Sequence, residues 1–137
     1  MPDITGHCRC GRVTFATPGP VLWSGICHCE SCRRATASPC TAFVGVPRDS
    51  VSWAGDPKVS VSSEGTVQRL FCPDCGTQLA YQADRWRDES HLYMATLDDP
   101  NAVKPTAHFH WAERLPWLKI DDDLPKYATS ADGAAPT

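Results

Sequence analysis

The chain has 137 residues and a mass of 15.0 kDa, with 42% hydrophobic residues and a formal net charge of −3 at pH 7. This length predicts one domain with a core of its own. Nucleic-acid binding normally uses a basic face, and the slightly negative net charge gives no indication of one. No apolar run approaches the ~18 residues of a membrane span. The N-terminus carries no secretory signal, so we expect a cytoplasmic protein in which thiols stay reduced.

Short strand patterns separated by turn residues such as Pro18-Gly19-Pro20 follow one another along the chain. One short helix is expected from Cys29 to about Ala37, and Pro39 ends it. Ser63-Glu64-Gly65 has the composition of a hairpin loop. The sequence therefore predicts an all-β, irregular domain over residues 1–127 and a disordered tail over 128–137. The expected strands are 12–15, 21–23, 41–46, 51–53, 59–61, 67–71, 79–81, 91–95 and 117–120.

Seven of the eight cysteines lie in three groups, which are Cys8-Arg9-Cys10, Cys27-His28-Cys29-Glu30-Ser31-Cys32 and Cys72-Pro73-Asp74-Cys75. Zinc takes four thiolate or imidazole ligands in structural sites and three protein ligands in catalytic ones. The outer pairs complete a four-cysteine site of Cys8, Cys10, Cys72 and Cys75. Cys27, Cys29 and Cys32 then form a second site with an open fourth position. Disulfides or unused buried thiols are the alternative, and spacing alone would also allow the pairs to be exchanged between sites.

Several residues near these groups have two interpretations. His28 could be a fourth ligand, but its position between two cysteines favours a supporting or surface role. Cys40 stands alone and is more typical of a small core residue than of a reactive thiol. Arg33 and Arg34 fit either a solvated helix end or the binding of a carboxylate. His108 and His110 share a strand face if the segment is extended; either could transfer protons, although packing within an aromatic strand is the more common role.

The three cysteine motifs, in this order, resemble those of the glutathione-dependent formaldehyde-activating enzyme family, which includes the domain of centromere protein V. The residues that carry the resemblance are Gly6–Val13, Cys27–Arg33 and Phe71–Thr77, and it extends through Leu97-Asp98-Asp99-Pro100, His108 and Trp117 to Leu124–Tyr127. It implies an all-β fold of the β-tent (Mss4-like) type with two zinc ions. Cys8, Cys10, Cys72 and Cys75 would bind the structural ion, and Cys27, Cys29 and Cys32 the catalytic one.

The activity that this resemblance implies is that of a carbon–sulfur lyase which forms or cleaves S-hydroxymethylglutathione, with glutathione as the thiol partner. Arg33 or His108 would orient the substrate. The chain has Ala37, and Ala95 or Thr96, where the family often has glycine, which would narrow the pocket. The alternative function is a non-enzymatic zinc module that binds a protein or another macromolecule.

Overall fold

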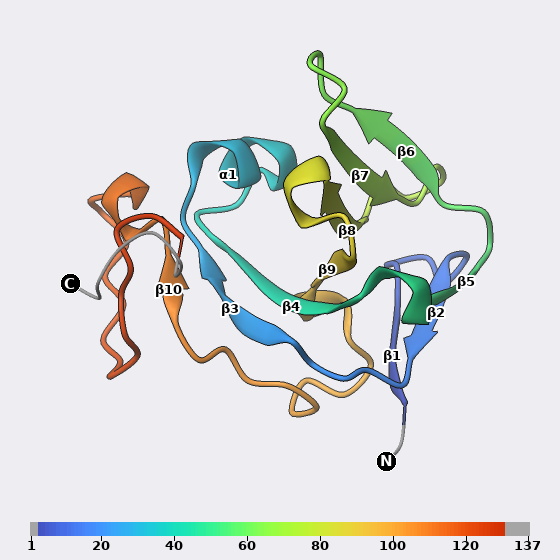
Figure 1. Cartoon of the computed structure of the whole chain (residues 1–137), viewed down its shortest axis with the longest axis horizontal. Coiled ribbons are helices and arrows are strands. Elements are labelled where there is room, and N and C mark those ends of the chain that lie inside the picture. Colours follow the sequence, from blue (N-terminus) through green and yellow to red (C-terminus); the bar gives the residue numbers. More distant parts are fainter. Residues whose placement is uncertain (1–2, 131–137) are drawn as a thin grey trace. The chain divides into compact units, whose positions relative to one another are not determined.

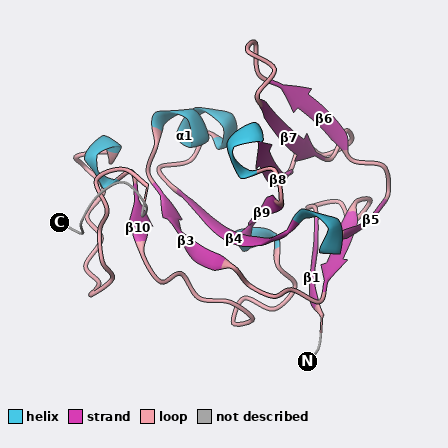
Figure 2. Cartoon of the chain, viewed as in Figure 1, coloured by secondary structure: helices cyan, strands magenta, loops and turns pink. Residues whose placement is uncertain are grey.

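The computed structural model describes residues 3–130 of the chain (Figures 1 and 2). These residues form two compact units, which are residues 3–23 with 44–103 (the first unit) and residues 24–43 with 104–130 (the second unit). Most of the tail predicted over 128–137 lies outside the described residues. Among the helices that the structure describes, none is long and apolar enough to cross a membrane.

A small antiparallel sheet opens the first unit. Its strand order is β1 (Ile4–His7), β2 (Thr14–Thr17), β5 (Ser52–Ala54). Ile4 lies opposite Thr17, and Thr14 lies opposite Ala54. The turn that joins β1 to β2 contains the first cysteine pair, so this sheet fixes the position of Cys8 and Cys10.

A larger run of strands in the first unit has the order β4, β9, β8, β7, β6. The pairs β6–β7, β7–β8 and β8–β9 are antiparallel. The hairpin from β6 to β7 closes over residues 62–67, where the backbone N–H of Gly65 donates to the carbonyl of Ser62 at 2.9 Å. The predicted hairpin loop at Ser63-Glu64-Gly65 is thus confirmed. The bounds of these strands are β4 (Thr41–Pro47), β6 (Lys58–Val61), β7 (Val67–Phe71), β8 (Gln78–Ala83) and β9 (Glu89–Tyr93).

The core of the first unit is apolar. Its buried side chains come from both sets of strands and include two cysteines: Cys8, Val13, Phe15, Val44, Val46, Leu70, Cys72, Leu79, Ala80, Leu92 and Leu97. Gly45 in β4 is required for close approach, because a Cβ there would lie 2.1 Å from the indole nitrogen of Trp23. That nitrogen donates to Glu89 Oε1 at 2.9 Å, which satisfies the one polar atom of the ring.

The second unit contains the only α-helix that the structure describes, α1 (Glu30–Thr36), which follows β3 (Trp23–Cys27). Strand β10 (His108–Phe109) pairs in parallel with β3, and the start of β4 lies on the other side of β3. Cys29 is the N-cap of α1, and Ala37 ends the helix with φ 54°. Glycine adopts this left-handed conformation without strain, so Ala37 stands at a position that favours glycine.

The all-β class predicted from the sequence is confirmed, together with most of the strands and the short helix. The short strand β1 was not predicted, and the extended segment considered around His108 and His110 forms a strand only over His108–Phe109, as β10. The strand predicted over 117–120 is wrong: Leu118 donates to the carbonyl of Leu115 in a turn, and Trp117 is 66% exposed. The strand predicted over 91–95 ends at Tyr93, where a single 3-10 turn (Met94–Thr96) begins. Further single turns are Arg48–Ser50, Asp84–Trp86 and Trp111–Glu113.

Candidate metal centres

The first cysteine cluster, in the first unit, is built from two loops of similar construction. In the loop of the first cysteine pair, the N–H of Cys8 donates to the carbonyl of Val13 at 3.0 Å, and Gly11 closes the turn with φ 83°. In the loop of the last cysteine pair, the N–H of Cys72 donates to the backbone carbonyl of Thr77 at 3.0 Å, and Gly76 closes the turn with φ 78°. Each glycine takes a left-handed conformation that other residues rarely adopt, and this lets the backbone curl around a sulfur atom.

The four sulfur atoms of Cys8, Cys10, Cys72 and Cys75 all lie within 4.8 Å of one another. The Sγ atoms of Cys8 and Cys10 are 3.6 Å apart, and those of Cys10 and Cys72 are 3.7 Å apart. Four thiolates around a zinc ion at ~2.3 Å would lie roughly 3.8 Å apart, whereas a disulfide holds its sulfurs at about 2.05 Å. All eight cysteines are free thiols. The first cluster therefore fits a tetrahedral metal ion and not a disulfide pair.

Contacts outside the sulfur atoms also join the two loops. Arg12 and Asp74 form an ion pair at 2.9 Å, and the backbone N–H of Arg9 donates to the hydroxyl of Thr77 at 3.0 Å. The same hydroxyl lies 3.2 Å from Cys75 Sγ and lowers the pKa of that thiol to about 5. A readily ionised Cys75 suits metal binding, because the thiolate is the form that coordinates.

The second cysteine cluster, in the second unit, consists of Cys27, Cys29 and Cys32, whose sulfurs also lie within 4.8 Å of one another. Cys27 ends β3, Cys29 caps α1, and Cys32 lies buried in the first turn of the helix. The backbone N–H of Cys32 donates to Cys29 Sγ at 3.3 Å. Within residues 3–130, no further Cys, His, Asp or Glu is grouped with these three. The arrangement thus provides three metal ligands from six consecutive residues.

Three thiols this close cannot ionise independently. Hydrogen bonds from Cys27 and Cys32 hold the pKa of Cys29 far below its usual value, while the same contacts raise the pKa of Cys27. Ionisation of Cys29 is therefore favoured over that of Cys27. A bound cation would displace the thiol protons, as metal binding by thiols requires.

His28, between two of these cysteines, is fully buried and is not grouped with the sulfur atoms. Its Nε2 lies 2.8 Å from Nδ1 of His108, and Nε2 of His108 lies 2.8 Å from Asp122. Burial is the main cause that lowers the pKa of His28 to about 4. The supporting role predicted for His28 agrees with this position, whereas the surface role does not. Asp122 was not singled out in the sequence, because it lies in a run of three aspartates with nothing to distinguish it.

The two arginines after the cluster differ in their surroundings. Arg34 is exposed and pairs with Glu30 at 3.3 Å, as a solvated helix end does. Arg33 donates to the carbonyl of His28 at 3.3 Å and to that of Glu113 at 3.4 Å. Arg33 thus stabilises the loop that carries the cluster. Cys40 is half-buried and belongs to neither cluster, and burial raises the pKa of its thiol.

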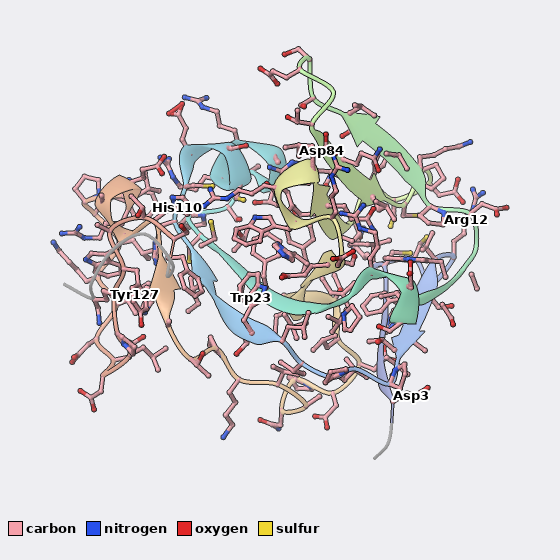
Figure 3. All side chains as sticks on the ribbon, in the orientation of Figure 1. Asp3, Arg12, Trp23, Asp84, His110 and Tyr127 are labelled. Carbon is pink, nitrogen blue, oxygen red and sulfur yellow. The ribbon has the colours of Figure 1, made fainter. Side chains whose placement is uncertain are left out.

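His108 and His110 separate in the structure. His108 is fully buried with a partner on each ring nitrogen, whereas the side chain of His110 is 33% exposed. His110 has φ 54° and therefore does not continue strand β10. Its Nδ1 lies 3.3 Å from Glu113, which also accepts a hydrogen bond from the N–H of Glu30. Figure 3 shows His110 beside the first turn of α1.

The fold and the two clusters define a small all-β protein with two cysteine-based sites that could hold metal ions. The family model for glutathione-dependent formaldehyde-activating enzymes matches residues 3–113, and the chain belongs to this family. The chain is 32% identical over 81 residues to an uncharacterized lyase of Schizosaccharomyces pombe; the match covers 59% of this chain and 58% of that protein's length.

A crystal structure of a Rhodobacter sphaeroides protein is similar in fold. Its TM-score is 0.59 at 21% identity, and the match covers 74% of this chain and 91% of that chain. This similarity, together with the observed strands and the family, confirms the predicted fold class.

Proposed function

We propose that the protein is a zinc-dependent carbon–sulfur lyase that acts on a small thiol adduct of the S-hydroxymethylglutathione kind. The family and the name of the yeast relative support a lyase. The observation that carries the proposal is the group of three sulfurs from Cys27, Cys29 and Cys32. Three protein ligands are typical of catalytic zinc and four of structural zinc.

The two clusters would hold one zinc ion each. Cys8, Cys10, Cys72 and Cys75 supply four thiolates, a set that closes the coordination sphere and stabilises the fold. At Cys27, Cys29 and Cys32, zinc would supply a positive charge beside the sulfur of the substrate and so favour its thiolate form.

In the cleavage direction, the carbon–sulfur bond of the adduct breaks and its electron pair stays on sulfur. The hydroxyl group loses its proton and becomes the carbonyl of the released aldehyde. The reverse direction forms the same bond from thiol and aldehyde. The protein must therefore stabilise a thiolate and exchange one proton with an oxygen atom.

The neighbouring residues orient the cluster in this proposal. Arg33 holds the carbonyl of His28 and thus the loop between Cys27 and Cys29. A direct contact between Arg33 and the substrate remains a prediction. His108 has both ring nitrogens engaged, so we assign it the orientation of His28, through the chain that ends on Asp122.

The test is turnover of glutathione and formaldehyde by the zinc-loaded protein and by Cys29→Ser. Loss of a ligand should lower turnover at least by the roughly 10–100-fold typical of residues that support a ligand. Cys40→Ser is the matched control, because Cys40 belongs to neither cluster and should leave turnover unchanged. Equal turnover by Cys29→Ser and the wild type would contradict the proposal.

A further inference from the structure

We propose that His110 is the catalytic residue that exchanges a proton with the substrate oxygen at the second cluster, and that Glu113 positions it. This inference rests on the proposed function, in which a thiol adduct reacts at Cys27, Cys29 and Cys32.

The backbone brings His110 to the cluster. In the parallel pairing of β10 with β3, Phe109 lies opposite Cys27, and His110 is the next residue. In a continued strand, alternation would turn His110 to the same face as His108, whose ring is fully buried. The left-handed φ of 54° at His110 breaks this alternation, and its side chain remains 33% exposed. A substrate can reach the ring of His110 but not that of His108.

Glu113 fixes His110 to the start of α1. One carboxylate oxygen of Glu113 lies 3.3 Å from Nδ1 of His110, and the other accepts the backbone N–H of Glu30 at 3.1 Å. Glu30 directly follows Cys29, the N-cap of the helix. Glu113 thus links His110 to the residue that directly follows Cys29.

The contacts also determine which nitrogen can react. The negative charge of Glu113, 3.3 Å from Nδ1 of His110, favours the neutral tautomer that carries its hydrogen on Nδ1 and its lone pair on Nε2. Glu113 approaches Nδ1 and not Nε2 of His110. In His108, by contrast, Nδ1 contacts His28 and Nε2 contacts Asp122. His108 therefore has no nitrogen left for a substrate.

The proton transfer follows from this assignment. In cleavage, the hydroxyl of the adduct gives its proton to Nε2 of His110, the electron pair of the O–H bond forms the carbonyl bond, and the carbon–sulfur bond breaks with its pair on sulfur. In synthesis, Nε2–H returns the proton to the aldehyde oxygen as sulfur attacks carbon. Glu113 stabilises the imidazolium that forms between these steps. No oxidant or reductant takes part.

The first experiment measures turnover of glutathione and formaldehyde by three zinc-loaded variants. His110→Gln should lower kcat by about a hundredfold or more, the usual contribution of general acid–base catalysis, with zinc content unchanged. Glu113→Gln should lower kcat less, because its side-chain oxygen can still accept the N–H of Glu30. His7→Gln is the matched control, since His7 is also exposed and paired with a carboxylate, that of Asp98 in the first unit. Added imidazole should restore part of the activity of His110→Ala, which a purely structural role would not allow.

The second experiment does not require turnover. Diethyl pyrocarbonate acylates accessible imidazoles, so it should modify His110 and His7 but not the buried His28 and His108. Glutathione should protect His110 and leave His7 reactive. Protection without turnover would reject the lyase and support His110 as part of the thiol site. Turnover that His110→Gln leaves unchanged would overturn the role of His110 and keep the lyase. Absence of both turnover and protection would overturn both.

Discussion

The two cysteine clusters use the same ligand atom in different surroundings. The first has four sulfurs from two loops 62 residues apart in sequence, and Cys8 and Cys72 belong to an apolar core. The second has three sulfurs from six consecutive residues, and the histidine within that segment, His28, is fully buried. We propose that this difference separates a site that stabilises the fold from a site that carries out chemistry.

The physical reason lies in what each metal ion would constrain. An ion at the first cluster closes a long loop, so its binding removes much of the conformational entropy of the unfolded chain. An ion at the second cluster bridges residues that β3 and α1 already hold together. We therefore expect the first ion to contribute to folding and the second to contribute little.

The largest expected effect comes from removing one ligand of each cluster. Cys75→Ser should leave the protein unfolded or strongly destabilised, because structural zinc contributes on the order of 10 kcal/mol against total stabilities of about 5–15 kcal/mol. Cys29→Ser should remain folded, with a Tm lower by only a few degrees, about 2–8 °C for each 1 kcal/mol. Circular dichroism during heating measures both. Equal loss of Tm in the two variants would remove the distinction between the clusters.

A chelator should separate the clusters in time. We expect a chelator such as EDTA to remove about one zinc equivalent quickly from the second cluster, with the far-ultraviolet circular dichroism unchanged. The second equivalent should leave slowly and together with the folded structure, because binding at a closed site is coupled to folding. Metal content and circular dichroism recorded on the same samples test this. Simultaneous loss of both ions with unfolding would show that the clusters are not independent.

The smallest expected effect concerns the ion pair between the loops of the first cluster. Arg12 and Asp74 are 39% and 58% exposed, so solvent screens their pairing, which should contribute little to stability. Asp74→Ala should lower the free energy of unfolding only slightly, and high salt should reduce the difference. Arg34→Ala, which breaks the exposed pair with Glu30 in the second unit, is the matched control. A loss as large as that of Cys75→Ser would show that the ion pair, and not the metal, holds the loops.

The features that the sequence predicts correctly are those encoded within a few neighbouring residues. The spacing of Cys27, Cys29 and Cys32 and the alternation in segments such as Val67–Phe71 are readable within a few residues, and the structure agrees with them. The partition of the outer pairs required a contact between Cys10 and Cys72, which the order of the motifs suggested but spacing alone left open.

The contacts that separate His108 from His110 could not be predicted in this way. His28 and His108 are 80 residues apart, and Asp122 and Glu113 lie in segments without periodicity. Side chains alternate between the two faces of a strand, but the left-handed conformation of His110 ends the strand, so the alternation does not apply to its ring. Trp117 shows the same limit, since an apolar run there forms a turn.

The central claim is that the first cluster has its full set of ligands and the second accepts a thiol. The most direct test replaces zinc by cobalt and follows sulfur-to-metal absorption during titration with glutathione. We expect an increase equivalent to one added thiolate per chain, and no increase in Cys29→Ser. Binding should release a proton and strengthen as pH rises toward the thiol pKa of about 8.5, because the thiolate is the form that binds. A spectrum that glutathione leaves unchanged would contradict the claim.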